Sequence, residues 1–214
     1  MKKEIVTFLA LCSLSIAAIG QVNYGVKGGV NLGKSSYSEA NFKDYQTNNV
    51  SFYITGYSEF SIAKNTAIQP GISLQGKGDK YKFDKNNLDG SVTWSTMSIE
   101  IPVNAIYYIP TGVSGSFFLG AGPYIGFNVS GKQKAKGNID NWVSNGNKNL
   151  KFTGSKRDMN LIDAGLNFLG GYKLNNGLLV NIGYGLGLSN LSPSNDSDRK
   201  LSNRTFSFGI GYQL

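Results

Sequence analysis

Residues 97–110, with the sequence MSIEIPVNAIYYIP, decide the fold of this chain. Apolar or small residues occupy the odd positions of this stretch, and polar residues and two prolines occupy the even ones, with Ile106 as the apolar exception. A period of two predicts a β-strand with two unlike faces. The carboxylate of Glu100, between two isoleucines, then allows two interpretations. It faces solvent if the apolar face covers a soluble core, and it faces the lumen of a barrel if the apolar face meets lipid.

The same alternation recurs along the rest of the chain. Long polar segments and short turns alternate as connections, and no segment has a convincing helical period. An even number of such strands, with short turns at one end and long polar connections at the other, is typical of an outer-membrane barrel. We therefore predict an all-β fold, an eight-stranded antiparallel up-and-down transmembrane β-barrel with both termini on the periplasmic side. The expected strands are 22–33, 50–63, 66–77, 97–110, 117–129, 159–174, 178–189 and 205–214.

The N-terminus has the features of a secretory signal peptide. Lys2 and Lys3 form a basic start, an apolar run follows, and small residues precede Gln21. This pattern predicts Sec-type export and removal of residues 1–20, which leaves 21–214 as the barrel domain. We therefore expect the protein in the outer membrane.

The composition argues against most kinds of chemistry. The chain of 214 residues has no histidine, and its one cysteine, Cys12, lies in the expected signal peptide. Histidine is the commonest general base and metal ligand, so its absence removes the usual nucleophile–base pairs. We expect no catalytic residue, no metal site and no cofactor, and therefore a non-enzymatic protein.

A soluble eight-stranded calyx with its apolar face inward is the structural alternative, and it would be a periplasmic binder of apolar ligands. Two observations disfavour it. The polar face is rich in glycine, which suits a crowded lumen better than a solvent-exposed surface. Aromatic residues on the apolar face also gather near one end, as in a membrane-interface girdle: Tyr24, Phe60, Tyr107, Phe117, Tyr172 and Tyr212.

Three prolines fall inside the expected strands, and each lacks the N–H that a sheet ladder needs. We expect bulges or local distortions at Pro70, Pro102 and Pro123.

The polar faces of the strands carry charges that would lie inside the barrel. Unpaired buried charge is costly, so we expect ion pairing. The interior of eight strands is just wide enough for side chains to fill, which favours a plug that fixes strand register over a path for protons or ions. The expected lumen charges are Lys27, Glu59, Lys77, Glu100, Asp163 and Lys173.

Residues 130–158 form a basic segment with only Asp140 and Asp158 as acids. A surface of this charge either binds lipopolysaccharide phosphates, anionic glycans or a protein partner, or is a solvated loop next to the phosphate layer. The expected basic loop comprises Lys132, Lys134, Lys136, Trp142, Lys148, Lys151, Lys156 and Arg157.

Several stretches resemble the outer-membrane β-barrel family of Bacteroidota that includes the PorT-like proteins. The most specific are Glu100-Ile101-Pro102 and residues 120–124, with the sequence GAGPY. The resemblance spans essentially the whole mature chain and implies an exported eight-stranded barrel. PorT-like proteins take part in type IX secretion, but no residue of this chain singles out that branch.

The expected function is a structural, adhesive or partner-binding barrel that displays four loops at the cell surface. Its expected partners are outer-membrane lipid or lipopolysaccharide and a surface protein, with no nucleic acid among them. An accessory role in a secretion machine, with a partner from that machinery, is the alternative.

Overall fold

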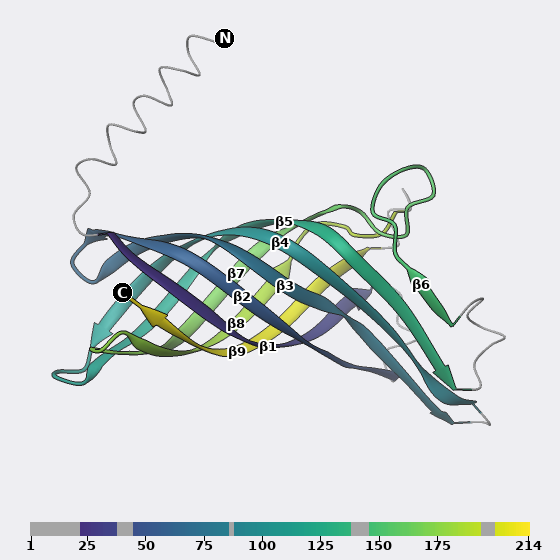
Figure 1. Ribbon diagram of the computed structural model, residues 1–214, viewed down its shortest axis with the longest axis horizontal. Helices are drawn as coiled ribbons and strands as arrows, with labels where there is room; N and C mark the ends of the chain where they lie inside the picture. The colour runs from purple at the N-terminus through teal and green to yellow at the C-terminus, as the bar shows by residue number, and fades with distance from the viewer. Residues whose placement is uncertain (1–21, 38–44, 86–87, 138–145, 194–199) are drawn as a thin grey trace, which may run out of the picture.

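The chain forms a closed antiparallel β-barrel (Figure 1). A computed structural model describes residues 22–37, 45–85, 88–137, 146–193 and 200–214. No helix in these residues is long and apolar enough to cross a membrane. The expected signal peptide, 1–20, lies outside the described residues. The strands are β1 (Val22–Tyr37), β2 (Gln46–Ala63), β3 (Thr66–Lys85), β4 (Leu88–Pro110), β5 (Gly115–Gly137), β6 (Asn147–Asn149), β7 (Ile162–Leu174), β8 (Leu178–Gly187) and β9 (Leu201–Gln213).

The barrel consists of every described strand except β6. Each barrel strand pairs antiparallel with the next along the chain, and β1 pairs with β9 to close the ring. The short β6 adds only to the far part of β5, where Lys134 lies opposite Asn147. The predicted eight-stranded up-and-down barrel is confirmed. The beginning of β1 and the end of β9 lie at the same end as the short turns, at the left of Figure 1.

The two faces of β4 show which side of the barrel is polar. Ser98 and Glu100 are buried inside the barrel, whereas Ile99 and the 47% exposed Ile101 point outward. The same division holds around the ring, where polar side chains fill the interior and apolar ones cover the outside. Ile106, the apolar exception of the sequence pattern, is buried in the lumen. The barrel is therefore built for an apolar surrounding, and a calyx with an apolar interior is wrong.

Two of the short turns depend on residues in the left-handed region. Asn65 has a φ of 62° between β2 and β3, and Gly177 has a φ of 90° between β7 and β8. Asparagine and glycine tolerate this conformation better than other residues. Because tight turns of this kind join neighbouring strands directly, the connections at this end of the barrel are short.

At the opposite end, β3, β4 and β5 are longer than the sequence predicts. We expected residues 78–91 and 130–158 to be loops, but β3 continues to Lys85, β4 begins at Leu88 and β5 continues to Gly137. These three strands project beyond the rest of the barrel at the lower right of Figure 1. We call them the sheet extension, comprising 78–85, 88–97 and 130–137. The column of apolar outward side chains ends there because neither face meets the hydrocarbon of the membrane, and so the sequence resembles a loop.

The three prolines interrupt the ladder without shifting its register. Pairing between β2 and β3 is missing opposite Pro70, between β3 and β4 near Pro102, and between β4 and β5 opposite Pro123. The strands resume the same register on either side of each gap. The expected distortions are therefore present as local gaps, and the register shifts fall elsewhere, for example between Met97 and Ser98.

The outward apolar face gives a direct test of the membrane-facing band. Ile101→Arg places a charge at mid-height on the lipid side, and we expect it to lower the free energy of unfolding by about 2–4 kcal/mol. Urea unfolding of the protein refolded into lipid vesicles measures this change. Thr93→Arg, at an outward position of the sheet extension, is the matched control and should cost far less. Equal losses for the two variants would contradict the assignment of the band.

Candidate functional site

An ion triad lies at mid-height inside the barrel. Lys77 on β3 places its Nζ 2.9 Å from Oδ2 of Asp163 on β7, and it also forms an ion pair with Glu100 on β4. Lys77 and Glu100 are each 3% exposed, and Asp163 is fully buried. One cation between two carboxylates links three strands that are not all neighbours in the ring. Buried charge of this kind is tolerated only when it is paired.

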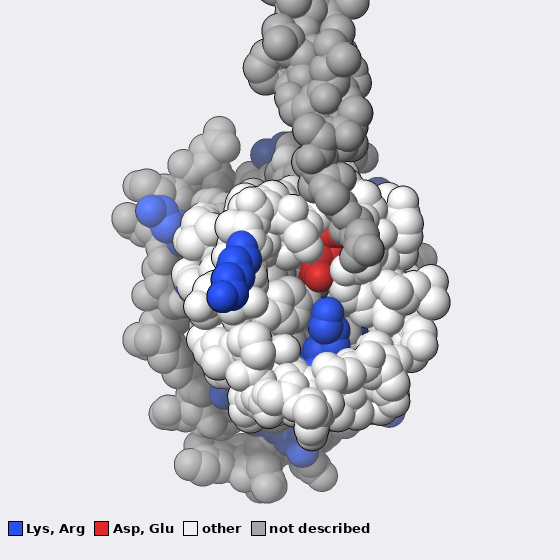
Figure 2. All heavy atoms as spheres, turned by 90° about the vertical axis from the view of Figure 1, so that its left-hand side faces the viewer, with Lys and Arg blue, Asp and Glu red and all other residues white. Residues whose placement is uncertain are grey.

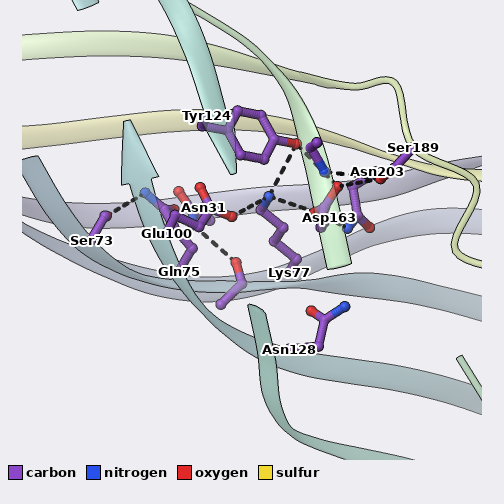
Figure 3. A network of polar contacts seen from close by, with 12 residues as sticks. Asn31, Ser73, Gln75, Lys77, Glu100, Tyr124, Asn128, Asp163, Ser189 and Asn203 are labelled. Atoms are coloured by element: carbon purple, nitrogen blue, oxygen red, sulfur yellow. Dashed lines mark hydrogen bonds and ion pairs between the residues drawn. The ribbon is translucent and has the colours of Figure 1, made fainter. Parts of the chain in front are cut away.

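Neutral donors complete the environment of Asp163 (Figure 3). The Nδ2 of Asn203 donates to its Oδ2 at 2.8 Å, and the hydroxyls of Ser189 and Tyr124 donate to its Oδ1 at 3.2 and 3.3 Å. The ring of Tyr124 also lies under Lys77, with Nζ 4.4 Å from the ring centroid. This position requires Gly165, where a Cβ would come within 2.8 Å of the ring. The lumen glycines thus make room for tyrosine rings.

A second cluster lies closer to the short-turn end. The carboxylate of Glu59 accepts hydrogen bonds from Gln69 at 2.6 Å, from Gln213 at 2.9 Å and from the hydroxyl of Tyr108. The ammonium of Lys173 lies 4.5 Å from the Tyr108 ring centroid and donates to Oε1 of Gln213 at 3.3 Å. Glu59 is therefore stabilised mainly by neutral donors.

The remaining lumen cation, Lys27, lies over a ring as well. Its Nζ is 5.2 Å from the centroid of Tyr57. Charged side chains of both signs are visible inside the opening at this end of the barrel (Figure 2). The structure thus places the six expected lumen charges in two groups and not in one network. Lys77, Glu100 and Asp163 form ion pairs, whereas Lys27, Glu59 and Lys173 rely on tyrosines and amides.

Four tyrosines belong to this site although the sequence did not predict them there. Tyr53, Tyr57, Tyr108 and Tyr124 all occupy polar-face positions, and this placement was the available signal. A hydroxyl on an inward-facing ring finds partners in a polar lumen, and the ring fills space that smaller side chains leave.

A small cavity of about 60 Å³ borders Lys77 and Glu100 of the triad. Its lining includes Lys27, Asn31, Asn104 and Thr205. Asn31 Oδ1, Asn104 Oδ1 and Thr205 Oγ1 are buried without a hydrogen-bond partner in the part of the chain that the structure describes. Polar walls and this volume suit a few water molecules. The same described part contains no group of three acidic, histidine or cysteine side chains suited to a metal ion.

An apolar cluster covers the triad on the side of the sheet extension. Met159, Leu191 and Leu201 are buried together, and Phe152 lies against them. Leu201 is the next inward-facing position of β9 beyond Asn203, which bonds Asp163. The lumen is therefore filled by charges at mid-height and by apolar side chains farther out.

The expected basic loop is divided between a strand and true loops. Lys132, Lys134 and Lys136 lie on β5, and all three are exposed. Their prediction as loop residues is wrong because β5 continues through them. Lys156 is exposed in the connection before β7, and Trp142 lies outside the described residues.

The other basic residues of this segment have partners close by. Lys148 on β6 is ion-paired with Asp158, and the Lys151 amide donates to the same carboxylate at 2.9 Å. Partial burial opposes ionisation, but these two hydrogen bonds hold the pKa of Asp158 below its usual value. The Nε of Arg157 donates to Oδ1 of Asn160 at 2.8 Å. These residues stabilise the connection between β6 and β7.

Comparison with known families agrees with this geometry. Residues 14–192 match the family model of the outer membrane protein beta-barrel domain. The chain belongs to this family. The match to the outer-membrane barrel domain ends before β9, the strand that closes the ring. Among curated proteins, no relative matches the chain.

Several solved structures are similar to this outer-membrane barrel. Ail of Yersinia pestis is 11% identical over 91% of this chain and 99% of its own, with a TM-score of 0.44. Neisserial surface protein A is 13% identical over 89% and 96%, with a TM-score of 0.45. OprG of Pseudomonas aeruginosa is 14% identical over 90% and 95%, with a TM-score of 0.40.

The triad makes a clear prediction about stability. Lys77→Met leaves Glu100 and Asp163 buried without their cation, and we expect the free energy of unfolding to fall by about 3–5 kcal/mol. Urea unfolding in lipid vesicles measures this loss. Adding Glu100→Gln and Asp163→Asn to the same chain should recover much of it. Lys151→Met, at an exposed lysine, is the control. If the single and triple variants were equally unstable, the triad would not be the cause.

Proposed function

We propose that this outer-membrane barrel is a non-enzymatic, closed anchor that presents its sheet extension and outer loops for binding a partner. The main support for this proposal is that side chains fill the lumen. Lys77 bridges two carboxylates at mid-height, and the cluster around Leu191 fills the barrel beyond them. An interior filled in this way supports structural or binding work at the surface more than transport through the barrel.

The asymmetry of the two ends supports an orientation. Short turns and both described ends of the barrel lie together, and the sheet extension projects from the opposite end (Figure 1). Outer-membrane barrels have short periplasmic turns and longer extracellular connections. We therefore assign the short-turn end to the periplasm and the sheet extension to the cell surface. The alternative role beside a secretion machine stays a prediction, as does the origin in Bacteroidota.

Electrical recording tests the closed lumen. The full chain, reconstituted into a planar lipid bilayer, should give no steady single-channel conductance, because the triad and the apolar cluster fill the path. An open porin in the same bilayer is the positive control. Conductance steps whose frequency rises with the amount of wild-type protein would overturn the proposal of a closed anchor.

Cysteine labelling tests the orientation in intact cells. The only cysteine of the chain is Cys12, inside the expected signal peptide. The labelling of a single introduced thiol can therefore be measured without background from other cysteines. Ser155→Cys lies in the exposed connection before β7, and Val113→Cys lies in a short turn where the native side chain is 93% exposed. A membrane-impermeant maleimide should label the first variant in intact cells and the second only after the outer membrane is permeabilised. The reverse pattern would invert the assignment.

A further inference from the structure

A register shift turns the lysines of β5 toward the outside of the barrel. The shift falls in the β4–β5 pairing, where Asn128 is buried before it and Gly131 is buried after it. The inward side of β5 therefore passes from even to odd positions. As a result Lys132, Lys134 and Lys136 continue the outward column that begins with the lipid-facing side chains of the same strand.

The same outward face carries two more lysines on β3. Across the sheet extension, residues of β5, β4 and β3 stand opposite one another in rows, and paired residues share a face. Two rows have a lysine at each side and a hydroxyl between them. These rows are Lys134–Thr93–Lys80 and Lys136–Ser91–Lys82. We call the five lysines 80, 82, 132, 134 and 136 the lysine ladder.

The dimensions of the ladder suit a small multivalent anion. Neighbouring strands lie about 4.8 Å apart, so the two lysine columns are separated by about 10 Å. Flexible side chains from both columns reach a group placed between them, above the hydroxyls of Thr93 and Ser91. An ammonium on each side and a hydroxyl at the centre can donate to a tetrahedral phosphate.

No acid whose side chain the structure describes is paired with the lysine ladder. Among the residues whose side chains the structure describes, none forms an ion pair with any of the five lysines. Asp79, the nearest described acid on β3, is buried on the inward face, where it accepts from Gln46 at 3.0 Å. Lys148, by contrast, is occupied by Asp158.

The ladder begins where the apolar band ends. On β5 the exposed Phe127 and Val129 come just before Lys132. On β4 the residue opposite Lys132 is Ser95, and the exposed Ile99 points outward four residues farther along the same strand. A cation directly beyond the hydrocarbon band lies at the level of the lipid head groups. The neighbours of this face are therefore the lipids of the adjoining leaflet.

We propose that the lysine ladder binds phosphate groups on the heads of lipids in the adjoining leaflet and holds them against β3, β4 and β5. The occupant is a lipid that remains in the membrane and not a free anion. This inference rests on the family assignment and on the position of the ladder. It does not depend on which side of the membrane the sheet extension faces, so it can fail while the closed-anchor proposal stands.

Lipid retention tests the ladder. The full chain is reconstituted into nanodiscs of phosphatidylcholine with a minor fraction of phosphorylated lipid A. Native mass spectrometry then measures the lipid that stays bound to the protein when it is released from the nanodisc. The ladder variant changes Lys80, Lys82, Lys134 and Lys136 to Gln. The matched control changes Lys148, Lys151, Lys156 and Arg157 to Gln, which removes the same charge from a neighbouring region. Heat-dependent gel mobility verifies that each variant is folded.

We expect wild type and control to retain lipid A in preference to phosphatidylcholine. The ladder variant should retain at least about tenfold less, because each surface lysine adds a several-fold gain toward an anionic surface. Retention that is equal in the ladder and control variants would overturn the proposal.

Two measurements on wild type decide the matter even if the ladder variant fails to fold. Dephosphorylated lipid A should lose the preference, and roughly 1 M salt should weaken it because the Debye length falls to about 3 Å. Undiminished retention in either condition would overturn the role of phosphate. Displacement of lipid A by millimolar inorganic phosphate would show a site for a free anion and overturn the assignment to lipid.

Discussion

The need to satisfy polar groups inside a barrel surrounded by lipid governs this structure. The outward side chains of the band are apolar, so the charges of the strands are directed into a narrow interior. There Lys77 forms ion pairs with two carboxylates at once. Tyr124 and Asn203 donate further hydrogen bonds to the carboxylate of Asp163. Because the triad joins β3, β4 and β7, a slip of any one of these strands would leave buried charge unpaired.

The sequence predicts the part of the barrel that lipid constrains. Alternation in residues 97–110 identifies both the strand and its inward face, because a membrane enforces one apolar side. In the sheet extension both faces meet water or head groups, so the apolar outward column ends at Val129 and β5 resembles a loop from Lys132 onward. Lys80 and Lys82 join the ladder only through strand pairing, and a bulge of one residue on β5 decides which way its lysines point. Neither fact is visible in a linear pattern.

The sequence predicts that the interior is polar, but it does not predict which interior side chains contact one another. Six charges on polar faces indicate a polar lumen, yet their division depends on which side chains meet across the ring. Glu59 is matched by Gln69, Gln213 and Tyr108, which come from three strands. Long-range neighbours of this sort follow from strand tilt and shear, which a single sequence does not reveal. The tyrosine rings were the missing partners.

The pairing of β1 with β9 has a consequence for how the molecule is made. Gly25 lies opposite Gln213, so the contact that seals the ring joins residues that are 188 positions apart in the sequence. Contacts of such sequence separation form late and slowly, since a long loop must close first. Until then β1 and β9 each present an unpaired edge, which is a template for aggregation in water. During assembly these two edges therefore have to stay apart from other chains until β1 and β9 pair.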